Sequence, residues 1–89
     1  MRRIILHRRA VKYLRRMLRE RQVEVVCALE ELAALPKIAE YPNVKPLAGE
    51  FAGWFRLRVG AYRAIVQARK EGTDETLYVD YIGPRGDAY

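Results

Sequence analysis

Residues 55–65 have the sequence FRLRVGAYRAI, and this stretch decides the fold. Apolar residues alternate with arginines over its first half, which is the period-two pattern of a half-buried strand. A tight turn is expected at Gly60-Ala61, followed by a second antiparallel strand from Tyr62 to Arg69. The alternating residues are Phe55, Arg56, Leu57, Arg58 and Val59.

The hairpin is followed by a third strand and preceded by a long loop. Towards the C-terminus, Gly72-Thr73-Asp74 predicts a turn and Leu77 to Ile82 a last strand, which Gly83-Pro84 ends. On the N-terminal side, three prolines mark a loop from about Lys37 to Gly53. These segments predict three antiparallel strands after a long loop.

The first 35 residues predict a strand and two helices. Arg3 to Leu6 is rich in β-branched residues, and a helical pattern starts at about Arg8. A second helix ends before Pro36 and carries Cys27, which we expect to be buried. The fold class is therefore α+β, with the order β-α-α-β-β-β and an αα-hairpin packed on one face of the sheet. The helix residues expected against the sheet are Val11, Leu14, Leu18, Val26 and Leu29.

The composition indicates a single small domain, residues 1–89, that binds polyanions. An apolar share of 51% is typical of a globular chain. Seventeen Lys and Arg against eleven Asp and Glu give a net charge of +6. That charge favours nucleic acids as partners, although small domains also carry such charges for solubility.

Single residues exclude several kinds of site. Cys27 is the only cysteine, so no internal disulfide or cysteine-rich zinc site can form, and a reducing cytoplasm is expected. His7 is the only histidine, which excludes a multi-histidine metal site, and we expect no metal or organic cofactor. The apolar run Ile4-Ile5-Leu6 is far too short for a signal sequence or a membrane span.

Three stretches of the sequence resemble the RelE/ParE superfamily of toxins from toxin–antitoxin pairs. Residues 56–65 closely follow the family pattern R-L-R-x-G-x-Y-R-x-I. Residues 83–89 resemble its G-x-R-x-x-x-Y tail, and Lys45 to Gly49 matches a Lys-Pro-Leu-Ala-Gly stretch. The superfamily contains both ribosome-dependent mRNA endonucleases and gyrase inhibitors, so the resemblance leaves the activity open.

The resemblance to the nucleases implies roles for four residues. Arg63 matches the arginine that braces the scissile phosphate, and Arg85 the arginine credited with phosphate contact and help to the leaving group. Tyr89 matches the tyrosine that stacks on or orients the nucleotide. Arg56 falls where RelE proper has a lysine thought to act as base. In the mechanism that these roles imply, the RNA 2′-OH is the nucleophile and no metal is needed.

This sequence departs from RelE proper at the proton acceptor. Arg56 suits a phosphate clamp, because a guanidinium keeps its proton in proteins. Glu50 and Lys45 are the remaining proton acceptors before the strand, and Glu50 is our candidate general base on chemical grounds. We expect Lys45, Trp54 and Arg58 to contact the substrate, with Trp54 as a platform for a base. Trp54 also stands where RelE proper has a second lysine, and Pro84 replaces a histidine that many members carry.

Plainer explanations remain open for several of these residues. Arg58 and Arg63 could be solvated strand arginines paired with Asp80 or Glu75, and Trp54 a packing anchor. The chain as a whole could be a gyrase inhibitor without nuclease activity or a non-catalytic binding module. The resemblance also implies partners: mRNA, the ribosome and a cognate antitoxin, expected to be acidic and partly disordered, that assembles with the toxin into an oligomer.

Overall fold

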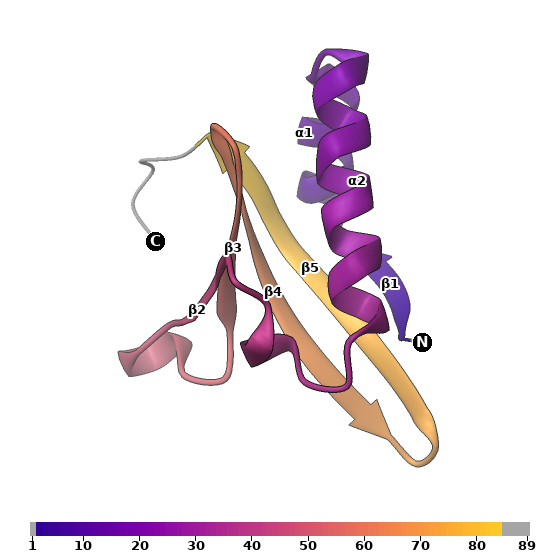
Figure 1. The fold of residues 1–89 in the computed structure, drawn as a ribbon, viewed down its shortest axis with the longest axis vertical. Coiled ribbons are helices and arrows are strands. Elements are labelled where there is room, and N and C mark those ends of the chain that lie inside the picture. The colour runs from indigo at the N-terminus through magenta and orange to yellow at the C-terminus, as the bar shows by residue number, and fades with distance from the viewer. Residues whose placement is uncertain (1, 85–89) are drawn as a thin grey trace.

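The computed structural model describes residues 2–84, which form a five-stranded sheet with two helices on one face (Figure 1). The elements are β1 (Arg3–Leu6), α1 (Arg8–Arg16), α2 (Arg19–Ala34), β2 (Val44–Pro46), β3 (Phe55–Val59), β4 (Tyr62–Glu71) and β5 (Asp74–Pro84). The strand order is β1-β5-β4-β3-β2, in which β1 is parallel to β5 and all other neighbours are antiparallel. The predicted α+β fold, with the helices on one face of the sheet, is confirmed.

The three predicted antiparallel strands are β3, β4 and β5. The turn at Gly60-Ala61 joins β3 to β4, and Gly60 has a φ of 57°, a left-handed conformation that glycine adopts without strain. A second turn at Gly72-Thr73 joins β4 to β5. Both long strands extend beyond the predicted ends, because their hydrogen-bonded pairing continues to Glu71 and Asp74 at the exposed tip of the hairpin.

The predicted loop from Lys37 to Gly53 is partly wrong, because it contains the edge strand β2. Val44, Lys45 and Pro46 pair with Leu57, Arg56 and Phe55 of β3. A proline is tolerated here because an edge strand has neighbours on one side only. Short 3-10 turns, Ile38–Glu40 and Gly49–Phe51, lie on either side of β2.

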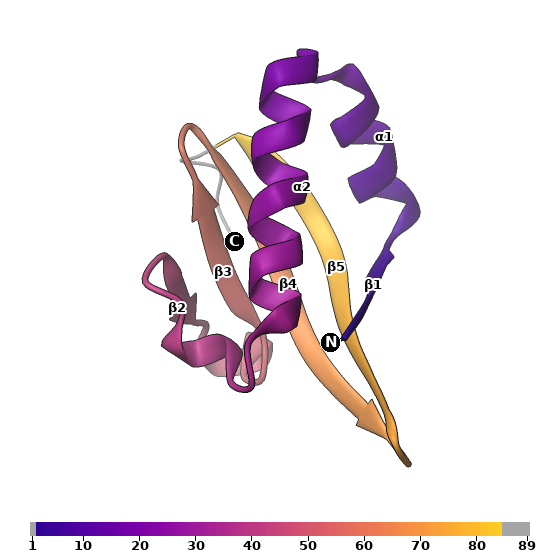
Figure 2. The same cartoon turned by 45° about the vertical axis from the view of Figure 1, so that its right-hand side comes forward.

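Side chains complete both ends of α1. The His7 Nδ1 atom accepts a hydrogen bond from the backbone N–H of Arg9 at the start of α1 (3.1 Å). The Gln22 side-chain amide donates to the carbonyls of Leu14 and Met17 where α1 ends, which ties the two helices together. Figure 2 shows α2 lying across the sheet and α1 on the β5 side. Neither helix is long and apolar enough to span a bilayer.

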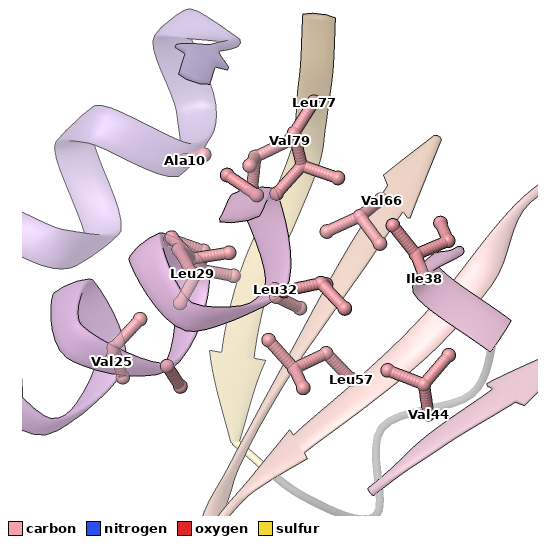
Figure 3. Packing of buried hydrophobic residues seen from close by; sticks show 14 residues of the cluster. Ala10, Val25, Leu29, Leu32, Ile38, Val44, Leu57, Val66, Leu77 and Val79 are labelled. Atoms are coloured by element: carbon pink, nitrogen blue, oxygen red, sulfur yellow. The ribbon is translucent and has the colours of Figure 1, made fainter. Parts of the chain in front are cut away.

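The core lies between α2 and the sheet (Figure 3). Leu29 was correctly predicted, and Val11 and Leu14 are half-buried. The prediction that Leu18 and Val26 pack against the sheet is wrong, since they are 73% and 38% exposed. Cys27, which we expected to be buried, is also exposed. The chain breaks its helical phase between α1 and α2, which turns a different stripe of α2 towards the sheet. That stripe consists of Val25, Ala28, Leu29, Leu32 and Ala33.

Candidate functional site

The sheet face opposite the helices, here called the open face, carries a cluster of positive side chains. In β3, Leu57 is buried in the core, so its neighbours Arg56 and Arg58 point to the open face. Residues directly opposite one another on paired strands share a face. Lys45 is paired with Arg56 and Arg63 with Arg58, so all of these side chains are on the open face. We call Lys45, Arg56, Arg58 and Arg63 the basic cluster.

Arg63 is the buried member of this cluster. Only 9% of its surface is exposed, and its Nε atom is buried with no hydrogen-bond partner within residues 2–84. Burying a charged group without a partner is costly, and an unsatisfied buried polar atom in a folded protein calls for an explanation. A bound anion that supplies the missing acceptor would be such an explanation.

Of the two acidic residues expected beside Arg63, Asp80 is paired with another residue and Glu75 lies elsewhere on the sheet. Asp80 forms an ion pair with Arg9 of α1, at 2.5 Å between Oδ2 and the guanidinium nitrogen. Glu75 lies opposite Lys70 near the far end of the β4–β5 hairpin. Among residues 2–84, the ion pair that Asp80 forms is therefore with Arg9 and not with Arg63.

Like charges face each other in both rows of the basic cluster. Arg58 lies directly opposite Arg63, and Lys45 directly opposite Arg56. Such cross-strand pairs of equal sign are destabilising, by roughly 0.2–1 kcal/mol each. Lys45 and Arg58 are exposed, so water screens part of the repulsion, but Arg63 is not. A polyanion bound along these strands would offset the repulsion between the cationic side chains, because each of them would attract it.

Trp54 belongs to a second group of side chains. It is half-buried and meets Tyr78 edge to face, with the ring centres 6.0 Å apart. The Arg69 guanidinium lies over both rings, 4.2 Å from the Tyr78 centre and 5.7 Å from that of Trp54. Trp54 directly precedes β3, two residues or about 7 Å along the chain from Arg56 at the edge of the basic cluster. The structure therefore gives Trp54 packing partners and places it beside the basic cluster rather than in it.

Glu50 lies apart from Arg63. It is exposed in the 3-10 turn Gly49–Phe51, at the tip of the connection between β2 and β3. Figure 1 shows that tip at the end of β3 opposite to the turn into β4, where Arg63 follows Tyr62. The structure brings Arg56, Arg58 and Arg63 together with Lys45, but it does not bring Glu50 to them.

The predicted residues Arg85 and Tyr89 lie outside the described residues. The described part of β5 ends at Pro84, which is paired with Tyr62, and Gly83 is paired with Arg63. Within residues 2–84, no group of three or more His, Cys, Asp or Glu side chains is placed to bind a metal ion.

Sequence reasoning missed Tyr81. This residue is paired with Ile65 of β4, and its ring extends over Gly83, the partner of Arg63. A Cβ atom on Gly83 would lie 2.1 Å from the Tyr81 hydroxyl oxygen, so the phenol occupies the space that a side chain at position 83 would need. Alternation from Leu77 and Val79 predicts that residue 81 faces the helices. No local signal reveals the change of face.

Comparisons with known proteins identify the fold. A YoeB/ParE toxin from Agrobacterium tumefaciens has a TM-score of 0.77 and 15% identity, with 93% of this chain and 98% of that chain covered. A chain of the archaeal RelE–RelB complex from Pyrococcus horikoshii has a TM-score of 0.75 and 26% identity, with 98% of both chains covered. The toxin–antitoxin complex RelBE2 from Mycobacterium tuberculosis gives 0.63 and 25%, with 94% and 98% covered. No family model and no curated protein sequence matches the chain.

Proposed function

We propose that this chain, which shares the fold of the RelE/ParE toxins, is a toxin that cleaves mRNA on the ribosome. The observation that carries the proposal is the buried Arg63 within the basic cluster, whose Nε atom has no hydrogen-bond partner among residues 2–84. A gyrase inhibitor that acts by binding alone has no need for a buried arginine whose Nε atom lacks an acceptor among the described residues. A phosphate-cleaving site does, because the transition state gathers negative charge on phosphate oxygens.

In the proposed reaction the 2′-oxygen of a ribose attacks the adjacent phosphorus, and the bond to the 5′-oxygen of the next nucleotide breaks. The products are a 2′,3′-cyclic phosphate and a free 5′-hydroxyl. The 2′-OH loses one proton and the leaving 5′-oxygen gains one, so the reaction needs no external oxidant or metal. Arg63 stabilises the charged phosphorane, while Arg56 and Arg58 hold the phosphates on either side.

The remaining roles rest on the family resemblance. Arg85 would contact the phosphate and assist the leaving group, and Tyr89 would stack on the nucleotide. Glu50 stays our candidate proton acceptor, and it has to approach the basic cluster when RNA and the ribosome are bound. Lys45 is the other proton acceptor close in sequence, and it is already in the cluster, opposite Arg56.

We propose a cognate antitoxin as the protein partner. One of the similar structures is named as a toxin–antitoxin complex and another as a RelE–RelB complex. The net charge of +6 favours an acidic, partly disordered chain that folds on contact. Co-expression with the neighbouring gene product should give a stable complex, and failure to co-purify would count against this partner.

The test of the proposed activity is cell-free translation with purified protein, followed by primer extension on the mRNA and, in parallel, a gyrase supercoiling assay. Breaks at codons in the ribosomal A site support the proposal. Lost supercoiling with intact mRNA supports a gyrase inhibitor instead, and neither effect indicates a non-catalytic module.

Variants localise the activity. Arg63→Ala should reduce the cleavage rate at least ~100-fold, as expected for a group that stabilises developing charge. Arg85→Ala should do the same if its implied role is right. Arg16→Ala is the control: it removes the same charge from an exposed residue of α1, outside the basic cluster. This variant should cleave within about twofold of the wild-type rate. An unchanged rate in Arg63→Ala would remove that residue from the site.

A further inference from the structure

The last strand changes face partway along its length. Leu77 and Val79 belong to the core, and so does Ile82, although a regular strand alternates faces at every residue. The pairing explains this, because Val79 lies opposite Val66 whereas Tyr81 lies opposite Ile65. Asp80 is therefore an additional residue in β5, a β-bulge, and it shifts the alternation by one position.

Arg9 of α1 holds the bulged residue by two contacts. Its Nε atom donates a hydrogen bond to the Asp80 backbone carbonyl (3.0 Å), and its terminal nitrogen is 2.5 Å from the Asp80 carboxylate. Directly before α1, the backbone N–H of His7 donates to the carbonyl of Val79 (2.8 Å). The start of α1 thus binds the chain at the point where the strand changes face.

The bulge brings Tyr81 and Gly83 to the open face. Gly83 lies opposite Arg63, and the Tyr81 hydroxyl occupies the position next to Gly83 where a Cβ atom would otherwise be. Cβ positions directly opposite across a sheet are about 4.5–5.5 Å apart, so the hydroxyl lies within about 8 Å of the Arg63 Cβ. Bulges occur beside active sites, where they redirect a side chain.

We propose that Tyr81 is a further substrate-contacting residue of this site, and that Arg9 and Asp80 are its positioning residues. The inference rests on the proposed nuclease function. The Tyr81 hydroxyl donates a hydrogen bond to a non-bridging oxygen of the phosphate that Arg63 binds. Tyrosine hydroxyls are among the groups that contact phosphate oxygens in nucleic-acid complexes. Arg63 alone is a planar donor on one side of the anion, and Tyr81 adds a donor from the neighbouring strand.

The alternative is that the Tyr81 ring only covers Gly83. Tyr81→Phe separates the two explanations, because it keeps the ring and removes the hydroxyl. Tyr78→Phe is the matched control on the same strand, since the Tyr78 ring packs with Arg69 and Trp54. The measurement is the rate of mRNA cleavage in the translation assay, with the thermal midpoint of each variant recorded alongside.

Tyr81→Phe should cleave at least about 10-fold more slowly than wild type, the effect of losing one hydrogen bond to a charged group. Tyr78→Phe should stay within about twofold, because its hydroxyl is outside the site. If wild type cleaves mRNA and Tyr81→Phe cleaves equally fast, the assignment of Tyr81 fails and the proposed function stands. If wild type cleaves no mRNA, both fail.

The positioning role has a separate test. Arg9→Met removes both contacts to Asp80, and Arg8→Met changes the exposed neighbouring arginine as a control. If the Arg9–Asp80 contact positions the phenol, adding Tyr81→Phe to Arg9→Met should slow cleavage by less than about threefold, because a displaced hydroxyl has little left to lose. A full 10-fold loss in that background would overturn the positioning role. Asp80→Asn, which keeps the side-chain size, replaces Arg9→Met should that variant fail to fold.

Discussion

Arg58 lies directly opposite Arg63 across the β3–β4 ladder, so two guanidinium groups leave the same face of the sheet side by side. Arg58 is exposed and Arg63 is buried, so bulk water screens only one of the two charges. The arrangement is unfavourable for the isolated protein and favourable for a complex with a phosphate chain. Stability and function should therefore respond in opposite directions to substitutions here.

Arg58→Glu should stabilise the free protein and weaken its activity. The change turns a repulsive cross-strand pair into an attractive one, and the gain should be about 0.2–1 kcal/mol in the free energy of unfolding. Urea denaturation monitored by circular dichroism measures it. Lys37→Glu makes the same change in net charge in an exposed residue outside the sheet and should change stability by less than about 0.5 kcal/mol. A lower stability for Arg58→Glu would contradict the repulsion.

Arg63→Met should also raise stability while it abolishes cleavage. Methionine retains an unbranched apolar stem and leaves no buried polar atom without a partner. We expect a gain of about 1–3 kcal/mol, the usual penalty of an unsatisfied buried group. Arg63→Lys keeps a charge at this position and is the comparison variant. A loss of stability in Arg63→Met would mean that Arg63 has a stabilising partner in solution.

Gly83→Ala should displace Tyr81 without disrupting the strand. The added methyl would lie 2.1 Å from the Tyr81 hydroxyl oxygen and 2.5 Å from its Cζ atom, so the ring must swing away. In a double-mutant cycle with Tyr81→Ala, the cost of the alanine at position 83 should fall by at least ~0.5 kcal/mol, because the obstructing ring is gone. Additive changes in the free energy of unfolding would show that the two residues do not touch.

The part of the fold that the sequence predicts best is the β3–β4 hairpin. Its alternation of apolar residues and arginines, ended by Gly60, is a local signal that the tertiary structure follows without change. The same alternation predicted that Arg56 and Arg58 share one face, which brought the basic cluster within reach of sequence analysis.

The errors come from features that depend on distant contacts. Leu18 and Val26 continue the apolar stripe of α1 only if the chain forms one uninterrupted helix. The helix is interrupted at Met17 and Leu18, so α2 presents a different set of residues to the sheet. The core side of α2 includes Ala28 and Ala33, whose small side chains give a weak apolar signal.

Tyr81 could not have been assigned from its neighbours. Its face is set by the Asp80 bulge, and that bulge is held by Arg9, a residue 71 positions away in the sequence. A local period-two pattern contains no information about such a contact, and the alternation of Leu77 and Val79 points to the wrong face.

Trp54 should act mainly as a packing residue of the open face. Its ring meets Tyr78 edge to face and lies beneath Arg69, so Trp54→Ala removes both contacts. We expect a loss of about 1–3 kcal/mol in the free energy of unfolding, less than for a fully buried tryptophan because Trp54 is half-exposed. Trp54→Phe keeps an aromatic ring and should recover most of that loss.

A role of Trp54 as a platform for an RNA base would give a different result. Trp54→Phe and Trp54→Ala should then differ in mRNA cleavage by ~10-fold or more at equal folded fraction, because stacking on an aromatic ring contributes about 1–3 kcal/mol per base. Cleavage rates that track only the folded fraction of each variant would confine Trp54 to its packing role.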